Sequence, residues 1–149
     1  MADYVLRQTV EQDFPAIKQL IQQVRINPTG LSWQRFIVAE TINGRFAGCG
    51  QLKPHGDGTV EMASIAVVPS ERGRGLASLI IQRLVGDGPR PLYLTCRATL
   101  ETFYPKFGFR VIQQDQMPRY YRRLSRIAGL VNSLHITRDR MLVMVLDEP

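Results

Sequence analysis

The stretch that most constrains the fold covers residues 65–81, IAVVPSERGRGLASLII. It begins as an apolar run, turns through two glycines and two arginines between Arg72 and Gly75, and continues with apolar residues at helical spacing. This pattern predicts a buried strand, a tight turn and a helix start. The first N–H groups of a helix lack intrahelical partners, and arginines add charge-assisted bonds, so the turn suits a phosphate.

The alternative interpretation is an ordinary strand-to-helix connection with solvated arginines. Two known phosphate-binding loops are excluded by the residues present. No Lys-Ser or Lys-Thr follows the glycines, as a nucleotide P-loop requires, and no Gly-x-Gly-x-x-Gly marks a dinucleotide fold. The pattern that remains is Arg72-x-x-Gly75-x-Ala77 after a strand that ends at Val68.

The rest of the chain alternates strand-like and helix-like segments. Period-2 and period-3.6 patterns predict strands over 4–10, 35–40, 45–52, 59–68, 92–96, 109–113 and 141–146, and helices over 14–25, 76–85, 100–107 and 118–134. Asn43-Gly44 is a strong hairpin signal between two of these strands. Gly108 is a natural residue to end the third helix.

Two motifs and this element order resemble the GNAT N-acetyltransferases. The turn is similar to their acyl-CoA pyrophosphate loop, Gln/Arg-x-x-Gly-x-Gly/Ala, and residues 103–109, FYPKFGF, are similar to their Tyr-x-x-x-Gly-Phe segment. The resemblance covers the chain apart from residues 114–140. It implies one α/β (α+β mixed) domain over residues 1–149, with a mixed, mostly antiparallel sheet flanked by helices. An extra basic helical insertion would precede the last strand.

The resemblance implies transfer of an acetyl group from acetyl-CoA to a primary amine by direct attack in a ternary complex. The amine could belong to a small molecule, a peptide, a protein N-terminus or a lysine. In the family a backbone N–H near Val67 or Val68, at a bulge, binds the oxyanion. The expected cofactor-binding residues are Ala66, Val67, Val68, Arg72, Gly73, Arg74, Gly75, Leu76, Ala77, Arg97 and Tyr104.

Glu61 is the candidate catalytic base. It lies eleven residues before Arg72, the spacing at which the histone-type branch of the family has its base. Two other interpretations stay open: an exposed glutamate on one face of a strand, or a carboxylate that acts through a relayed water.

Tyr104 is the candidate general acid, because it lies four residues before Gly108 as the family motif requires. Its alternative role is packing on the sheet beside Phe103. Many family members have an Asn seven residues before this tyrosine, where this chain has Arg97. Arg97 could instead contact a CoA phosphate or an acidic acceptor.

The basic charge is concentrated near the C-terminus. Residues 119–140 carry +5 of the formal net charge of +6. An apolar stripe is expected there at Leu124, Ile127, Ala128, Val131 and Leu134, next to the basic residues Arg119, Arg122, Arg123 and Arg126.

This segment could be an amphipathic helix with a solvated basic edge. It could instead be a site for an acidic acceptor, an anionic membrane surface or RNA. The rival to an enzyme is therefore a non-catalytic module that binds acyl-CoA or docks on an anionic surface through residues 119–126.

Cysteine use and the N-terminus bear on the compartment. Cys49 and Cys96 belong to no CxxC motif and are expected to be free thiols in a reducing cytosol, with no metal site. His135 is expected to be structural. The start MADYVLRQTV lacks the features of a signal peptide, so a cytoplasmic protein, monomeric or homodimeric, is expected.

Overall fold

The computed structural model describes residues 3–133 and 140–147. The chain divides into two compact units. The first unit consists of Met1–Lys53 and Met62–Asp87, and the second unit consists of Pro54–Glu61 and Gly88–Pro149.

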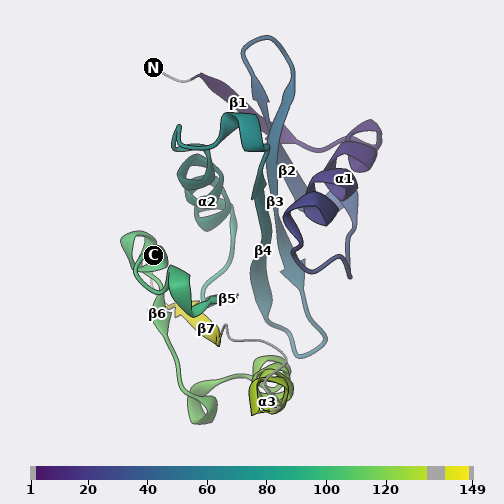
Figure 1. The fold of residues 1–149 in the computed structure, drawn as a ribbon. Coiled ribbons are helices and arrows are strands. Elements are labelled where there is room, and N and C mark those ends of the chain that lie inside the picture. The colour runs from purple at the N-terminus through teal and green to yellow at the C-terminus, as the bar shows by residue number, and fades with distance from the viewer. Residues whose placement is uncertain (1–2, 134–139, 148–149) are drawn as a thin grey trace. The chain divides into compact units, whose positions relative to one another are not determined.

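The described residues form seven strands and three α-helices, in nearly the predicted order (Figure 1). The strands are β1 (Tyr4–Gln8), β2 (Phe36–Thr41), β3 (Phe46–Pro54), β4 (Val60–Val67), β5 (Leu92–Arg97), β6 (Arg110–Val111) and β7 (Met141–Leu146). The helices are α1 (Phe14–Val24), α2 (Leu76–Asp87) and α3 (Arg119–Ser133). None of the described helices is both long and apolar enough to cross a membrane.

Hydrogen-bonded strands follow the order β1-β2-β3-β4-β5-β7-β6 in the described part of the chain. The pairs β1–β2, β2–β3, β5–β7 and β6–β7 are antiparallel, and β4 is parallel to β5 where Glu61 pairs with Tyr93. This mixed, mostly antiparallel sheet confirms the predicted fold class. The predicted hairpin is also present, since Gly44, at φ 83°, donates its N–H to the Thr41 carbonyl at 2.9 Å.

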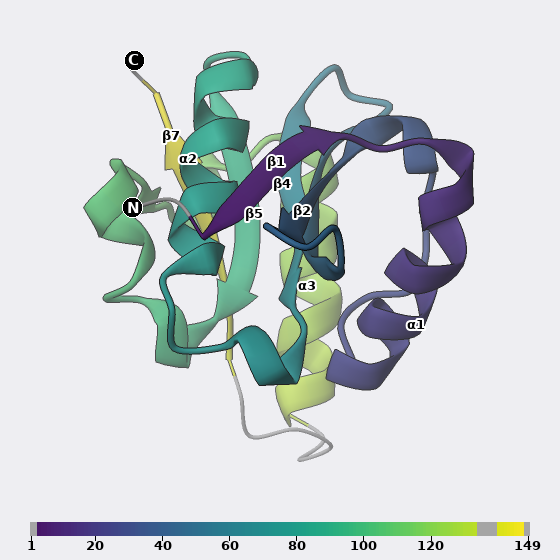
Figure 2. The same cartoon turned by 90° about the horizontal axis from the view of Figure 1, so that it is seen from above.

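In the first unit, α1 and α2 cover opposite faces of the strands (Figures 1 and 2). The apolar spacing of α1 turns one helix face toward the sheet, where burial of apolar side chains stabilises it. The buried side chains on this face are Ile17, Leu20 and Ile21 of α1 with Phe36, Val38, Cys49 and Ala66 of the strands. Burial raises the pKa of the Cys49 thiol to about 12, so it stays a neutral core group.

The other face of β3 accommodates α2 through two glycines. A Cβ at Gly50 would lie 2.8–2.9 Å from methyl groups of Ile65, Ile80 and Leu84, and one at Gly48 would lie 2.8 Å from the Ala66 carbonyl oxygen. Only glycine lets α2, which starts at the glycine turn, pack this close to the strand.

An irregularity lies in the middle of β4. Ser64 has φ 59°, a left-handed conformation that is unusual for a residue with a side chain. The buried Gln51 amide donates a 2.8 Å hydrogen bond to the Ser64 hydroxyl from the neighbouring strand. A left-handed residue of this kind is what a β-bulge uses to bend a strand.

The second unit has its own apolar core between α3 and the strands β5, β6 and β7. Its buried members are Tyr93, Ile112, Met117, Tyr121, Val143 and Val145. Tyr121 is the main contribution of α3, with a side chain that is fully buried. Its ring stacks on that of Tyr93 with centroids 4.8 Å apart.

The prediction of a helix over residues 100–107 was wrong. The structure has two short 3-10 turns there, Ala98–Leu100 and Tyr104–Phe107. Pro105 has no N–H and clashes within a continuous helix, which explains the interruption. Gly108, with φ 97°, ends the second turn as predicted.

The predicted apolar stripe of α3 was partly wrong. Ile127 is 56% exposed, whereas Tyr121, which the stripe omitted, is buried. The amphipathic face is therefore rotated toward the tyrosines, because a large aromatic ring fills more of the core than the aliphatic residues do. Leu134 and His135 lie outside the described residues.

Candidate active site

The glycine turn joins β4 to α2 in the first unit. Gly73 and Gly75 have φ values of 79° and 80°, and a Cβ at either would meet no atom within 4 Å. The backbone conformation, rather than close packing, therefore requires glycine here. Residues 72–75 are all exposed.

The start of α2 leaves several amides of this turn outside the helix ladder. Leu79 donates to the Gly75 carbonyl at 3.2 Å, so the amides of Leu76 and Ala77 precede the first helical hydrogen bond. The Arg72 amide donates to the Pro69 carbonyl at 3.3 Å. The amides of this turn that these hydrogen bonds leave free to bind an anion therefore begin after Arg72.

The end of β4 distinguishes the two candidate oxyanion donors. The Val68 amide donates to the Ala47 carbonyl at 2.8 Å and is occupied by strand pairing. Successive amides of a strand point to opposite edges, so the Val67 amide points away from β3. Of the two, Val67 is the one whose N–H is directed away from that pairing.

Glu61, at the start of β4, is buried in the second unit. Its side chain is 10% exposed, which excludes the interpretation as an exposed strand glutamate. Its Oε1 lies 2.7 Å from His55 Nε2, and its Oε2 accepts a 3.3 Å hydrogen bond from the Thr95 hydroxyl.

His55 was not identified from the sequence. Its side chain is 7% exposed and its ring stacks on Tyr120, with centroids 3.6 Å apart and an interplanar angle of 17°. Tyr121 meets the same ring edge-on, with centroids 5.7 Å apart. A histidine held in this way has a single orientation toward Glu61.

The hairpin register between β3 and β4 could have revealed this pair. His55 donates its backbone N–H to the Thr59 carbonyl at 2.9 Å, and Gly58 donates to the His55 carbonyl at 3.1 Å. In such a hairpin His55 and Glu61 are diagonal neighbours on one face. The glycines and Asp57 between them signal the turn, but only its length sets the register.

Asp57 connects this hairpin to the first turn of α3. Its Oδ2 accepts the Tyr120 backbone N–H at 3.0 Å, and its Oδ1 accepts both the amide and the hydroxyl of Thr59. Burial acts to raise the pKa of Asp57, but the hydrogen bonds from Thr59 and Tyr120 outweigh it and hold the pKa below its usual value. A charged Asp57 therefore caps α3, the end at which the helix dipole favours an anion.

Tyr104 is held in an aromatic cluster. Its ring meets those of Phe103 and Phe109 edge-on, with centroids 5.2 and 6.2 Å apart. Burial, and secondarily the charge of Cys96, raise the pKa of Tyr104 to about 12. Within the described residues its hydroxyl forms no hydrogen bond, and no interaction joins Tyr104 to Glu61.

Arg97 is the last residue of β5 and is exposed, opposite Met141 of β7. The strand therefore ends in an exposed arginine. Metal ligation has no support in residues 3–133 and 140–147, where no group of three or more His, Cys, Asp or Glu could hold an ion.

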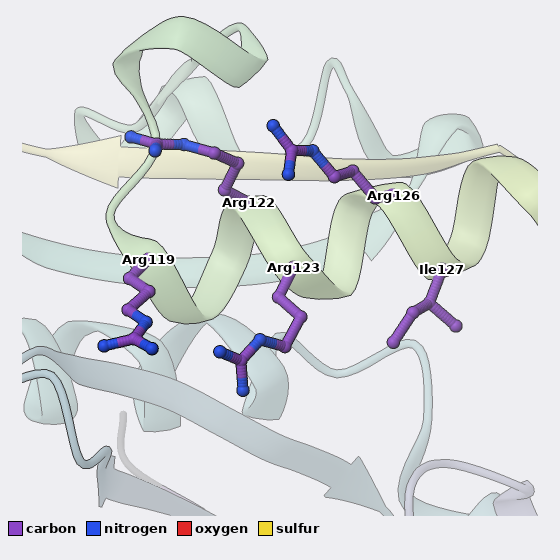
Figure 3. Close-up of a pocket in the computed structure, with 5 residues that line it drawn as sticks. All are labelled: Arg119, Arg122, Arg123, Arg126 and Ile127. Atoms are coloured by element: carbon purple, nitrogen blue, oxygen red, sulfur yellow. The ribbon is translucent and has the colours of Figure 1, made fainter.

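The arginines of α3 lie in two rows (Figure 3). Arg119, Arg123 and Ile127 extend from one side of the helix, and Arg122 and Arg126 extend from another. Arg122 donates to the Met117 carbonyl at 2.9 Å. Among the described residues, no carboxylate pairs with Arg119, Arg123 or Arg126, so these cations are available to an anion.

The arginines line two depressions in the surface of the second unit. Arg119 and Arg123 line one of about 300 Å³ together with Gly56, Asp57 and Tyr120. The four arginines and Ile127 line a larger one of about 470 Å³. Tyr120 lines the smaller depression, and its ring stacks on His55. The first row, Arg119 and Arg123, therefore lies next to the group formed by Glu61, His55 and Tyr120, which we call the Glu61 cluster.

The mixed, mostly antiparallel sheet is the fold expected of an acyl-CoA acyltransferase. The sequence profile described as the Acetyltransferase (GNAT) domain matches residues 32–111. The chain therefore belongs to the GNAT acetyltransferases, as its motifs indicate. No curated protein shows a significant match to the sequence.

Solved structures with the same fold are distant in sequence. The chain is 21% identical to N-acetylglutamate synthase from Neisseria gonorrhoeae complexed with coenzyme A and N-acetyl-glutamate, with a TM-score of 0.73. This likeness covers 99% of the chain but 36% of the synthase, so the chain spans about a third of that protein.

Two other similar structures match along nearly their whole length. Rv2747 from Mycobacterium tuberculosis in complex with CoA is 23% identical, with a TM-score of 0.72, over 97% of this chain and 99% of that one. The ribosomal-protein-S18-alanine N-acetyltransferase from Escherichia coli is 18% identical, with a TM-score of 0.65, over 98% of this chain and 96% of that one. At these identities the likeness establishes the fold.

Proposed function

We propose that this protein transfers an acetyl group from acetyl-CoA to the primary amine of an acceptor that carries a carboxylate. Attack is direct, within a ternary complex. The observation that carries the proposal is the burial of the Glu61 carboxylate on β4, the strand that leads into the glycine turn. Membership of the GNAT family and the coenzyme A present in similar structures support acyl-CoA as the donor.

The glycine turn binds the pyrophosphate of acetyl-CoA in this proposal. The amides from Gly73 to Ala77 and the side chains of Arg72 and Arg74 supply the hydrogen bonds. Each charge-assisted bond contributes roughly 1.5–3 kcal/mol, so a few of them account for micromolar affinity. Arg97 would contact another anionic group of the cofactor.

The chemical step begins with an ammonium, because an α-amine with a pKa near ~8 is only about a tenth neutral at pH 7. Glu61 accepts one proton from this ammonium. The freed lone pair attacks the thioester carbonyl carbon, and the Val67 amide donates to the oxyanion. The nitrogen of the tetrahedral intermediate then loses a second proton to solvent, the intermediate collapses, the C–S bond breaks, and the thiolate of CoA leaves.

Tyr104 assists the departing sulfur as a hydrogen-bond donor. Its pKa of about 12 is about 3.5 units above that of an ordinary thiol, so complete proton transfer would be uphill by about 5 kcal/mol. A hydrogen bond that strengthens as charge develops on sulfur avoids this cost, and solvent can supply the proton afterwards.

The acceptor class is inferred from the first arginine row. Arg119 and Arg123 have no carboxylate partner among the described residues, and they border Tyr120 at the edge of the Glu61 cluster. A carboxylate held there would orient the amine of the same molecule. The N-acetyl-glutamate found in the similar synthase structure supports an amino acid as the acceptor.

Thiol release from acetyl-CoA across a panel of amines tests this function. The panel consists of glutamate, glutamine, lysine, a short peptide and spermidine. Turnover should be higher for the amines that also carry a carboxylate than for spermidine, which carries none. Arg119→Gln with Arg123→Gln should raise the acceptor KM about tenfold or more, as expected for lost charged hydrogen bonds. Arg126→Gln, on the other row, is the matched control and should change that KM much less.

Equal turnover of spermidine and glutamate, or an equal effect of the control, would refute the acceptor assignment. It would leave the acetyl-CoA assignment standing.

A further inference from the structure

The Glu61 carboxylate is held asymmetrically within the second unit. Oε1 lies 2.7 Å from His55 Nε2, whereas the Thr95 hydroxyl, at 3.3 Å, is the only hydrogen-bond partner of Oε2 among the described residues. The first distance is that of a strong charged hydrogen bond, and the second is long for an O–H···O contact. Oε1 is therefore occupied by its contact with His55, and Oε2 remains available to accept another hydrogen bond.

The direction of the short bond follows from the chemistry of its partners. An ionised carboxylate can only accept hydrogen bonds, so Nε2 of His55 must carry the hydrogen. His55 can meet this requirement as a neutral ring or as an imidazolium. In either state the Nε2 proton belongs to the imidazole and points at Oε1.

The ring is immobilised by α3. Tyr120 stacks on one face at 3.6 Å, Tyr121 contacts it edge-on, and Asp57 anchors Tyr120 through its backbone N–H. Rotation of His55 away from Glu61 would require the loss of these contacts. The insertion that carries the arginines thus also orders the carboxylate.

We propose that His55 is a positioning residue that binds Oε1 of Glu61 and leaves Oε2 to accept the proton of the acceptor ammonium, with Tyr120 holding His55 in place. This inference rests on the proposed role of Glu61 as the base. In the step one N–H bond of the ammonium breaks and one O–H bond forms at Oε2. His55 keeps its own proton throughout.

The described charged and titratable groups around the ring come from the hairpin, β4 and α3. Asp57 of the hairpin interacts with it electrostatically, Glu61 of β4 bonds it, and Tyr120 and Tyr121 of α3 contact it. Arg119 and Arg123 line the depression that Asp57 and Tyr120 share. Any pH profile of the reaction has to be interpreted with these groups.

Two substitutions of His55 separate positioning from packing. His55→Leu fills similar space without a donor, whereas His55→Gln keeps an N–H donor but cannot titrate. His55→Leu should lower kcat roughly 10- to 100-fold, the equivalent of one charged hydrogen bond, with little change in the acetyl-CoA KM. A fall in kcat without a rise in the acetyl-CoA KM would separate loss of positioning from a general disturbance of the fold.

His55→Gln should recover most of the lost kcat. Tyr120→Leu should lower kcat as His55→Leu does, because the ring that stacks on His55 is lost. Tyr120→Phe keeps that ring and should keep most of the wild-type kcat. A folded His55→Leu variant with the kcat of the wild type would overturn the proposal. Equal losses of kcat in His55→Gln and His55→Leu would also overturn it, since they would indicate packing alone.

A measurement on the unmodified protein avoids any failure of the variants to fold. The chain has two histidines, so nitrogen NMR of histidine-labelled protein can resolve the His55 ring. Hydrogen on Nε2 is expected. A ring with hydrogen on Nδ1 and a bare Nε2 would overturn the proposal.

The same variants distinguish this proposal from the proposed function. Glu61→Gln should lower kcat at least as much as His55→Leu. Unchanged turnover in Glu61→Gln would refute Glu61 as the base and with it the role of His55. A large loss in Glu61→Gln with none in His55→Leu would refute the positioning role alone.

Discussion

Replacement of Tyr104 by phenylalanine tests the leaving-group role with little disturbance of the fold. The ring contacts with Phe103 and Phe109 do not involve the hydroxyl, and this hydroxyl bonds no described residue. Removal of an unpartnered hydroxyl should therefore change the free energy of unfolding by less than about 1 kcal/mol.

The catalytic effect should be much larger than the effect on stability. A hydrogen bond to developing thiolate charge contributes roughly 1.5–3 kcal/mol to the transition state, which corresponds to a fall in kcat of about 10- to 100-fold. The KM for acetyl-CoA should change little, because the bond strengthens only as the sulfur leaves. Continuous thiol detection under saturating acceptor measures both constants.

Tyr93→Phe is a matched control for this experiment. Tyr93 and Tyr104 are each 9% exposed, and within the described residues neither hydroxyl has a hydrogen-bond partner. The control should keep kcat within about twofold, in the range expected for a change that removes no transition-state contact. Equal kcat values for wild type and Tyr104→Phe would refute the role of Tyr104.

The pH dependence gives a second test of the same residue. Because the pKa of Tyr104 is raised to about 12, the hydroxyl keeps its proton at every pH below that value. Activity should therefore show no loss near pH 10 that depends on Tyr104. A basic limb near pH 10 that disappears in Tyr104→Phe would contradict the buried environment described above.

Three further variants test the cofactor site and the packing. Arg72→Ala with Arg74→Ala should weaken CoA binding about 10- to 100-fold by calorimetry, and unchanged affinity would refute the turn as the pyrophosphate site. Gly50→Ala should lower the free energy of unfolding by about 1–3 kcal/mol through overpacking, measured by urea denaturation; no loss would contradict the close approach of α2. The Arg7 guanidinium bonds Asp13 at 2.8 Å and is the main cause that lowers its pKa. This stabilisation exists above the unfolded pKa of about 3.9 and is lost as pH falls through the folded value, so Arg7→Met should cost about 1 kcal/mol at pH 7 and less below about pH 4. A cost that is independent of pH would contradict the pairing.

Local signals predicted the features that depend on a few adjacent residues. The glycine turn, the hairpin at Asn43-Gly44 and the helix-ending Gly108 each follow from backbone conformations that glycine adopts readily. The resemblance to the family added the expectation of a mixed, mostly antiparallel sheet, which local patterns cannot supply. These parts of the fold could therefore be predicted from the sequence.

Two features could not be predicted from the sequence, because they depend on strand register or on which side chains of a helix pack in the core. The contact between His55 and Glu61 requires the hairpin register, and a slip of one residue would place them on opposite faces. The face of α3 that is buried depends on Tyr121 displacing Ile127 from the core, which period alone does not determine. Both cases involve side chains that meet only after distant segments have packed.

Mass spectrometry of a reaction with acetyl-CoA and glutamate distinguishes the proposed acetyl transfer from binding of acyl-CoA or an anionic surface alone. Released thiol is counted in parallel. We predict that the amine gains one acetyl group for each thiol released, and that Glu61→Gln suppresses both. Tight binding of CoA without an acetylated product from any amine of the panel would contradict the account and support a binding module.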